Sequence, residues 1–229
     1  MVEGFLSELE PREREDLQKL GSVRRYRRGD VLFHQGDDAG AVLVLLEGHV
    51  KAAMMNDGRE VILAFPGPGE LLGELSAVDG KPRSATVRAV DDIEALVIPG
   101  SAFRAFLETR PRVALFLLCA VAARLREADR LRVDYAVNDV VVRVAGRLVE
   151  LCDRYGAEDG AGIDIGLAIT QDELAAWAGA SREAVAKGMA LLRTLGWIKT
   201  ERRRIIVLDL PALRRYSGLT SAPARPAAG

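Results

Sequence analysis

The stretch VLFHQGDDAGAVLVLLEGHVKAAMMNDGREVILAFPGPG, residues 31–69, indicates the architecture of the first half of the chain. Apolar runs such as Val42–Leu46, Val50–Met55 and Val61–Phe65 alternate with turns that contain Gly, Asp or Asn. Short strands about ten residues apart and separated by such turns are typical of antiparallel sandwiches and barrels. The same texture continues to about Pro99, so we predict an antiparallel β domain up to that point.

Composition is that of a globular protein, with 229 residues of which 49% are hydrophobic and 28% are charged. The 32 basic residues nearly balance the 33 acidic ones, so only the distribution of charge can indicate a nucleic-acid partner. Two cysteines cannot form a disulfide framework or ligate an iron–sulfur cluster alone, and we expect no metal site. The start of the chain lacks the apolar core of a signal peptide. No apolar stretch is long enough to span a bilayer, so we expect a cytoplasmic protein without a membrane partner.

Two helical regions flank the β domain. Residues before Gly21 predict a short amphipathic helix that Pro11 breaks early. Pro111 suits a first helical position, and the pattern then continues without Gly or Pro to Val137, about 38 Å of helix. An apolar seam on this helix predicts a parallel coiled coil in a homodimer, unless the seam packs on the chain's own β domain. The seam residues are Leu118, Val121, Leu125, Ala128 and Tyr135.

A further helix is expected to begin after Asn138 or Asp139 and to end before Gly156. Its core face carries Val141, Val144, Ala145, Leu148 and Cys152. The acidic, glycine-rich segment Gly156–Gly162 is expected to be a loop. The end of the chain from Ser217 has few bulky residues, so we expect it to be disordered.

Residues 72–85 read Leu-Gly-Glu-Leu-Ser-Ala-Val-Asp-Gly-Lys-Pro-Arg-Ser-Ala. A bound phosphate needs close backbone, the N–H groups of a short helix start, an arginine and a hydroxyl. Gly73, Arg83 and Ser84 can supply these groups together with the amides that follow Glu74. The Glu74 carboxylate would repel a bare phosphate but can accept from a ribose hydroxyl, which favours a nucleotide. The alternative is a surface ion pair between Glu74 and Arg83.

Residues 170–195 have the features of a helix-turn-helix, and a charged turn at Glu201–Arg204 predicts a two-stranded wing after it. Gly188 lies inside the second helix, where it costs about 1 kcal/mol relative to Ala, and a closely approaching helix would explain it. The wing turn has Arg202 where a glycine is expected. The features are a capping box of Thr170 and Glu173, a left-handed turn at Gly179, a cap at Ser181 and a buried Val185.

Charge gathers in this region, because residues 181–204 contain seven basic and two acidic side chains. Such a patch on an otherwise neutral protein is typical of a surface that binds double-stranded DNA. At the start of the second helix, Arg182 and Lys187 can donate to guanine and Glu183 can accept from cytosine. Residues suited to phosphate contacts are Gln171, Ser181 and Arg203.

These motifs resemble the cyclic-AMP receptor protein (CRP/FNR) family of transcription regulators over about residues 20–208. The resemblance is carried by Gly73–Leu75 with Arg83–Ala85, by Arg28–Asp30 with His34–Gly36, and by the helix-turn-helix. The predicted fold class is α+β. The predicted domains are a cyclic-nucleotide-binding β-roll or jelly roll in residues 1–110, a dimerisation helix in 111–137, a winged helix-turn-helix in 138–216 and a disordered tail in 217–229.

The resemblance implies roles for the residues of the first motif. Arg83 and Ser84 would hold the cyclic phosphate, Glu74 would take the ribose 2′-hydroxyl, and the amides of Gly73, Glu74 and Leu75 would assist. Arg124 on the long helix is similar to an arginine that helps to hold the sugar side of the pocket.

Ala128 and Asp129 stand where the family's cyclic-AMP sensors read adenine with Thr-Ser. Ala128 offers no hydroxyl group. Asp129 can accept from the amino group of adenine, or from two neighbouring donors of guanine. Because cyclic AMP is the usual ligand of the family, it is our first expectation. Cyclic GMP, another signal or no required ligand are the alternatives that stay open.

The resemblance assigns base reading to Arg182, Glu183 and Lys187 and implies a TGTGA-like half-site that is inverted in the second half. Lys187 replaces the arginine of the best-known member, so a bidentate contact to guanine is lost. The implied partners are double-stranded DNA, a second copy of the chain and RNA polymerase.

Two other classes of function are less consistent with the sequence. The only histidines, His34 and His49, are too few for a sandwich enzyme that uses several His ligands for a metal, so we expect no enzyme. A nucleotide-binding adaptor that does not bind DNA would leave the basic second helix unexplained.

Overall fold

The structure is a computed structural model that describes residues 4–219. The chain forms two compact units, one up to Asp129 and one from Arg130 onward, and each is described by itself. The domain boundaries expected from the sequence stay predictions. The part of the expected disordered tail from residue 220 onward lies outside the described residues.

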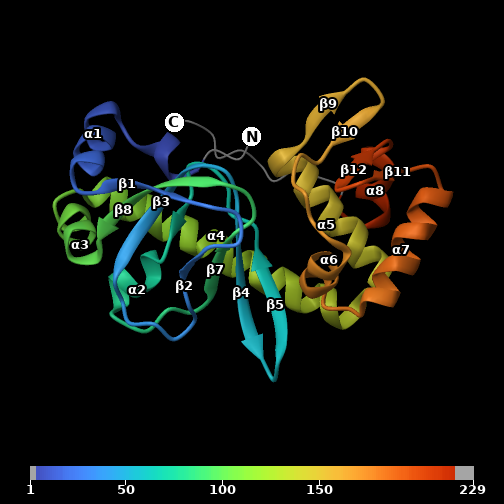
Figure 1. Cartoon of the computed structure of the whole chain (residues 1–229), viewed down its shortest axis with the longest axis horizontal. Coiled ribbons are helices and arrows are strands. Elements are labelled where there is room, and N and C mark those ends of the chain that lie inside the picture. The colour runs from blue at the N-terminus through green and yellow to red at the C-terminus, as the bar shows by residue number, and fades with distance from the viewer. Residues whose placement is uncertain (1–3, 220–229) are drawn as a thin grey trace. The chain divides into compact units, whose positions relative to one another are not determined.

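Two four-stranded antiparallel sheets form the β domain of the first unit (Figure 1). The first sheet has the order β1 (Ser22–Tyr26), β8 (Ile93–Pro99), β3 (Ala41–Glu47), β6 (Leu71–Leu72). The second has the order β2 (Val31–Phe33), β7 (Thr86–Ala89), β4 (Val50–Asn56), β5 (Arg59–Ala64). The predicted antiparallel β domain is therefore confirmed.

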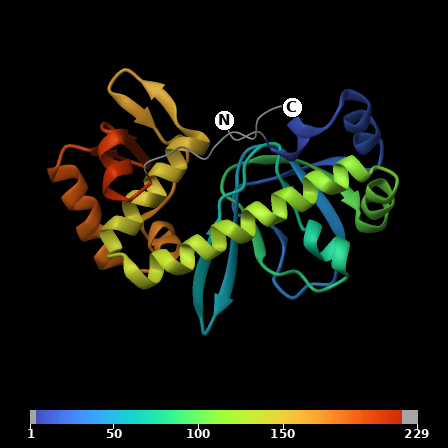
Figure 2. The ribbon, with the colours of Figure 1, turned by 180° about the vertical axis from the view of Figure 1, so that it is seen from behind.

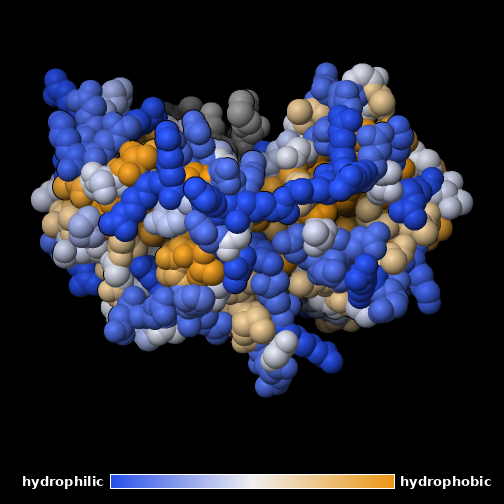
Figure 3. All heavy atoms as spheres, in the orientation of Figure 1, coloured by the Kyte–Doolittle hydropathy of each residue, from blue (hydrophilic) through white to orange (hydrophobic). Residues whose placement is uncertain are grey.

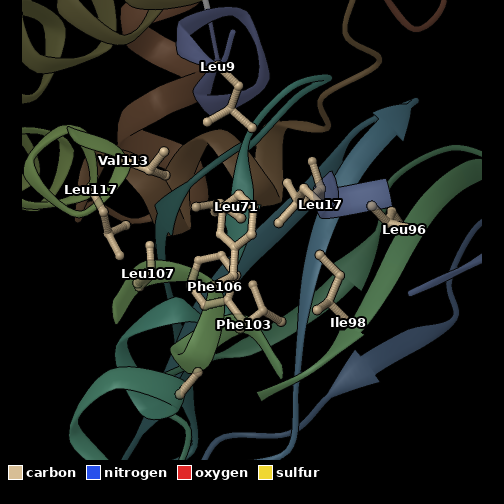
Figure 4. Packing of buried hydrophobic residues seen from close by; sticks show 13 residues of the cluster. Leu9, Leu17, Leu71, Leu96, Ile98, Phe103, Phe106, Leu107, Val113 and Leu117 are labelled. Carbon is tan, nitrogen blue, oxygen red and sulfur yellow. The ribbon is translucent and has the colours of Figure 1, made fainter. Parts of the chain in front are cut away.

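Strand β3 lies between two apolar layers. Val42 and Val44 belong to a core cluster shared with helices, part of which is shown in Figure 4. Leu43 and Leu45 belong to a second cluster, built from residues of both sheets. Because both faces of β3 are covered, its sequence is a continuous apolar run and does not alternate.

Helix α1 (Pro11–Lys19) follows a short 3-10 helix, η1 (Phe5–Glu8). Pro11 occupies the first turn of α1, and Glu10 and Glu13 form a capping box around it. The predicted break is therefore present immediately before Pro11, and Pro11 itself begins α1, where a proline lacks only an N–H that would be unpaired in any case. Helix α3 (Gly100–Glu108) was not predicted, and its Phe103 and Phe106 point into the core cluster in Figure 4.

Helix α4 (Pro111–Val137) is a single continuous helix with the predicted bounds (Figure 2). Its apolar seam is divided between two environments. Val121 of the seam packs against the core cluster of the first unit, next to Leu117, which lies outside the seam and is buried in that cluster. Leu118 and Leu125 are 63% and 60% exposed. Part of the seam thus packs on the β domain of its own chain, and part is open to a partner.

The second unit has the predicted winged helix-turn-helix fold. Its helices are α5 (Val140–Tyr155), α6 (Gln171–Ala178), α7 (Arg182–Thr194) and α8 (Leu210–Tyr216). Its antiparallel sheet has the order β11 (Ile198–Glu201), β12 (Arg204–Val207), β10 (Gly162–Asp164), β9 (Ala157–Asp159). The expected loop at Gly156–Gly162 is wrong, since these residues form most of the β9–β10 hairpin that extends the wing sheet.

Candidate nucleotide-binding and DNA-binding sites

Helix α2 (Glu74–Asp79) begins immediately after Gly73, as the sequence predicted. The φ angle of Gly73 is +78°, a left-handed backbone that favours glycine. A Cβ atom at this position would also overlap the guanidinium of Arg83. Gly73 is therefore required both by its backbone conformation and by the close approach of Arg83.

The Arg83 side chain is only 5% exposed and lies against this turn. Its Nη1 donates to the Gly73 carbonyl oxygen at 2.7 Å, and its Nη2 donates to that of Ala41 at 2.5 Å. The guanidinium also lies 4.4 Å from the ring centroid of Phe33. Burial lowers the pKa of Arg83, while the charges of Glu74 and Asp37 oppose that shift.

Glu74 is also buried, and its carboxylate pairs with the guanidinium of Arg124. Arg124 belongs to α4 and its Nη2 also donates to the Leu71 carbonyl oxygen at 3.4 Å. The alternative of a surface pair between Glu74 and Arg83 is wrong, because both side chains are buried and Glu74 pairs with Arg124. Two residues that the resemblance assigned to the sugar side are thus brought together.

The remaining predicted pocket residues are open to solvent. Leu75 is an exposed residue of the first turn of α2, and Ser84 is exposed next to Arg83. Ala128 and Asp129 are exposed on α4, about one turn beyond Arg124. Their roles toward a ligand stay predictions.

Three residues around Arg83 were not predicted. Ala41 contributes a carbonyl oxygen and Phe33 an aromatic face, while Asp37 accepts from the Arg83 backbone N–H at 2.8 Å. A backbone acceptor leaves no trace in the residue type. Phe33 and Asp37 flank the His34–Gly36 opening that carried the resemblance, which was the available signal.

The residues present fit a cyclic nucleotide. Only two of the five N–H groups of the Arg83 guanidinium are used in its bonds to carbonyl oxygens, so others can donate to a phosphate. The Arg124 charge offsets that of Glu74, which reduces the repulsion between this carboxylate and a nearby phosphate. The absence of a side chain at Gly73 lets the Arg83 guanidinium lie directly against the backbone at the start of α2.

The helix-turn-helix has the predicted local structure. Thr170 and Glu173 form the capping box of α6, and Gly179 has a φ angle of +59°. The Ser181 hydroxyl accepts from the Ala184 backbone N–H at 3.2 Å at the start of α7. Val185 is fully buried, as predicted, and so is Trp177.

The side chains predicted to contact DNA are exposed, namely Gln171, Ser181, Arg182, Glu183, Lys187 and Arg203. An ion pair joins Arg182 Nη1 to Asp172 Oδ2 at 3.5 Å and so links the starts of the two helices. Hydrogen bonds from its own backbone N–H and from Ser181 lower the pKa of the Glu183 carboxyl, and the charges of Arg182 and Lys187 add to this effect. Glu183 is therefore an anionic acceptor at neutral pH.

The wing carries less free positive charge than the sequence suggests. Arg204 pairs with Asp159 at 2.5 Å and with Asp164 at 2.6 Å, both on the β9–β10 hairpin. Lys199 pairs with Glu201 at 2.8 Å. Arg203 is exposed, and it takes the left-handed conformation of the turn with φ +60°, where the sequence suggested Arg202.

Gly188 is buried in α7 and faces α5. A Cβ atom there would lie 3.6 Å from the Val141 Cα, an ordinary contact. The expected close approach is thus present, but it would admit an alanine and excludes only larger side chains.

Among residues 4–219 no group of three or more His, Cys, Asp or Glu side chains is arranged to hold a metal ion. Cys119 and Cys152 are free thiols, and burial raises the pKa of Cys152 to about 12.

The surface view of Figure 3 shows mainly hydrophilic residues, with apolar ones in separate patches.

Comparison with known proteins assigns both domains to known families. A family model of the cyclic nucleotide-binding domain matches residues 23–110, and one of the Crp-like helix-turn-helix domain matches residues 142–216. A CRP-like cAMP-activated global transcriptional regulator of Mycobacterium tuberculosis is 32% identical over 213 residues, which are 93% of this chain and 95% of that protein. The chain belongs to the CRP/FNR family of transcription regulators.

Other members of the CRP/FNR family are similar over most of the chain. The cyclic AMP receptor protein of Thermus thermophilus is 36% identical over 178 residues, 77% of this chain and 79% of that protein. A solved CRP-family regulator from the same organism is 29% identical, with a TM-score of 0.71 and coverage of 85% of this chain and 96% of that one. The c-di-GMP responsive regulator CLP of Xanthomonas campestris has a TM-score of 0.77 at 22% identity, over 87% and 100% of the two chains, and supports the fold alone.

As a member of the CRP/FNR family, the protein is a cyclic-nucleotide-binding and DNA-binding transcription regulator. The family consists of regulators and not of enzymes. In the part of the chain that the structure describes, no helix is both long and apolar enough to cross a membrane.

Proposed function

We propose that the protein is a cytoplasmic homodimer that binds a cyclic nucleotide, with cyclic AMP first in order, and then binds a palindromic TGTGA-like site on DNA. The observation that carries this proposal is the ion pair between the buried Glu74 and the half-exposed Arg124, which joins the predicted nucleotide site to helix α4. The names of its relatives from Mycobacterium tuberculosis and Thermus thermophilus, which refer to cyclic AMP, support the choice of ligand.

Each residue of the nucleotide site has a separate task. Arg83 donates to the phosphate through N–H groups that its bonds to Gly73 and Ala41 leave over, and Ser84 adds a hydroxyl. The amides of Gly73, Glu74 and Leu75 point their partial positive charge toward the phosphate. Glu74 accepts from the ribose 2′-hydroxyl, and Arg124 stays beside it on the sugar side.

Base selection is assigned to Ala128 and Asp129. The carboxylate of Asp129 matches one donor of adenine but two neighbouring donors of guanine. Cyclic GMP is therefore the second candidate ligand, and direct titration of both nucleotides distinguishes the two.

The homodimer is supported by the exposed leucines of α4. Leu115, Leu118 and Leu125 are each at least 60% exposed in the single chain. Burying such side chains contributes about 1.5–3 kcal/mol each, so a partner helix is the natural cover for this face.

The two activities are coupled through α4. A ligand that prefers one register of the paired α4 helices would set the separation of the two copies of α7, the recognition helix, which carries the predicted base-reading residues. DNA accepts separations near one helical turn, about 34 Å, so a small change in register decides binding. RNA polymerase is the further partner that we propose for the DNA-bound dimer.

The proposal is tested by calorimetric titration of the full chain with cyclic AMP and, separately, cyclic GMP. We expect one of them to bind, and Arg83→Ala to weaken it about 10- to 150-fold, the value of a charge-assisted hydrogen bond. Arg88→Ala is the matched control, because this exposed arginine also donates to a backbone carbonyl oxygen, that of Gly29. Failure of both nucleotides to bind, or equal binding by the two variants, would contradict the assigned pocket.

The dimer and the DNA site are tested by light scattering and by fluorescence anisotropy at a stated salt concentration. We expect a dimer that prefers a duplex with two inverted TGTGA half-sites over a scrambled duplex. A monomer, or equal affinity for both duplexes, would exclude this part of the proposal.

A further inference from the structure

The turn between α6 and α7 is held by side chains from outside the helix-turn-helix. The Tyr135 hydroxyl donates to the Trp177 carbonyl oxygen at 2.9 Å. Arg143 Nε donates to the Ala178 carbonyl oxygen at 2.9 Å, and its Nη2 to that of Gly179 at 3.3 Å. Since the last carbonyl groups of a helix have no partner within it, these three bonds cap the end of α6.

The same arginine also holds the junction between α4 and α5. Arg143 Nη1 donates to the Asn138 carbonyl oxygen at 2.6 Å, and the whole residue is only 9% exposed. Its guanidinium lies 5.5 Å from the ring centroid of Tyr135. One buried side chain therefore ties the end of α4 to the turn that precedes the recognition helix.

Tyr135 also lies against the backbone of this turn. A Cβ atom on Gly179 would come 3.0 Å from Tyr135 Cε1, so the ring and the left-handed turn are in close contact. Gly179 is followed two residues later by Ser181, which caps α7. The start of the recognition helix is thus fixed relative to the last turns of α4 through a few short contacts.

The position of Tyr135 on α4 gives these contacts a function. Tyr135 lies eleven residues beyond Arg124, about 16 Å along the same helix. It was expected to be a seam residue, but its hydroxyl bonds within the DNA-binding unit.

We propose that Tyr135 and Arg143 are positioning residues for DNA recognition, which fix the recognition helix to the end of α4 and so make the dimer selective for half-site spacing. The inference rests on the proposed homodimer and palindromic site. Neither residue contacts DNA in this account, because both act through the turn at Gly179. A role limited to stabilising the fold would change the affinity for all DNA alike.

The test compares two duplexes with inverted TGTGA half-sites, one with centres one helical turn apart and one with two inserted base pairs. The insertion separates the half-sites by about 7 Å more. Affinities of the full chain are measured by fluorescence anisotropy with cyclic AMP, with cyclic GMP and with neither, and the condition of tightest wild-type binding is used. Failure of a ligand to act therefore does not prevent the test.

The variant is Tyr135→Phe, which keeps the aromatic ring and removes only the hydroxyl. The matched control is Tyr216→Phe on α8, whose ring packs against Trp197, 5.4 Å between centroids, away from the turn. We expect the wild type and the control to bind the longer duplex much more weakly. In Tyr135→Phe the ratio of the affinity for the shorter duplex to that for the longer duplex should fall about threefold to tenfold, as expected for the loss of one hydrogen bond. Thermal unfolding should show that the domain of this variant remains folded.

The outcomes separate the inference from the proposed function. If the wild type discriminates between the duplexes and Tyr135→Phe discriminates equally well, the positioning role is wrong and the proposed dimer stands. If the wild type binds both duplexes equally, the palindromic dimer is wrong, and the inference falls with it. A second variant, Arg143→Lys, keeps the charge but loses the planar fork, and it should reduce the ratio of the two affinities at least as much as Tyr135→Phe.

Discussion

The nucleotide site, called the sensor site below, and the DNA-binding site differ in how far their functional side chains are buried. In the sensor site Arg83 and Glu74 are buried and already bonded to carbonyl oxygens or to Arg124. At the recognition helix, Arg182 and Lys187 are exposed, and the fixed parts are the caps and buried residues behind them. A small ligand thus meets side chains that are already buried and bonded, whereas DNA meets exposed side chains on a packed support.

This difference predicts that a change of backbone or packing damages the sensor site most, whereas single side chains contribute small and separable amounts to DNA binding. The largest effect is expected at Gly73. In Gly73→Ala the Cβ would overlap Arg83, and the left-handed backbone would cost about 1–2 kcal/mol. Displacing the arginine and straining the turn together should weaken nucleotide binding by about a hundredfold in calorimetric titration, near the upper end of the range expected for Arg83→Ala.

Gly58→Ala is the matched control for this change. Its φ angle is +75°, almost that of Gly73, but a Cβ there would meet nothing within 4 Å. It bears the backbone cost alone, so nucleotide affinity should stay within about twofold of the wild type. Equal losses in the two variants would show that contact with Arg83 is unimportant.

Arg124→Ala should have the next largest effect. It leaves the buried Glu74 carboxylate without its partner, so the free energy of unfolding should fall by about 1–3 kcal/mol. Scanning calorimetry measures this change, and the exposed Arg126 on the same helix provides the control Arg126→Ala. Adding Glu74→Gln to Arg124→Ala should restore part of the loss, and no recovery would mean that the pair is not coupled.

In the DNA-binding unit, Arg203 and Arg204 are neighbours with different expected effects. Arg203 is exposed, so Arg203→Ala should lower the slope of log affinity against log salt by about 1. Arg204 is already paired with Asp159 and Asp164, so Arg204→Ala should leave the slope almost unchanged. Anisotropy titrations over several salt concentrations decide this, and equal slopes for the two variants would refute the assignment.

The smallest effect concerns the pH dependence of the wing. Hydrogen bonds from Arg204 and Gly166 outweigh burial and hold the pKa of Asp164 below its ordinary value of 3.8. A lowered folded pKa stabilises the fold fully above the unfolded value, and this contribution is lost as the pH falls below about 3.8 through the folded pKa. Asp164→Asn should remove that component from the pH profile of thermal unfolding, and an unchanged profile would show that the pair contributes nothing.

The two sites also differ in how far the sequence could predict them. The helix-turn-helix was predicted almost residue by residue, because its capping hydrogen bonds join residues only three positions apart in the sequence. Glu173 N–H donates to the Thr170 hydroxyl, and Ala184 N–H donates to the Ser181 hydroxyl. In the sensor site, the residue types at Gly73 and Arg83 were predicted, but the bond to Ala41 joins positions far apart in the chain. Pairing at such distance depends on the tertiary fold and leaves no periodic signal.

The β9–β10 hairpin was missed for a similar reason. Its segment is acidic and rich in glycine, and it becomes a strand pair only by joining β12, where Ile163 pairs with Val207 and Asp164 with Ile206. The same hairpin supplies Asp159 and Asp164, which pair with Arg204. From the sequence, Arg204 had been counted among the basic residues of the predicted DNA-binding surface. Helix α8 did have a local signal, an Asp209 cap with a proline in the first turn.

Reciprocity is the sharpest test of the proposed coupling between the nucleotide site and the DNA site. The affinity for the bound cyclic nucleotide is measured by calorimetry in the absence and presence of saturating palindromic duplex, at one salt concentration. We expect the duplex to tighten nucleotide binding by the same factor by which the nucleotide tightens duplex binding, typically about 5- to 150-fold. A nucleotide affinity that saturating duplex leaves unchanged would contradict this coupling.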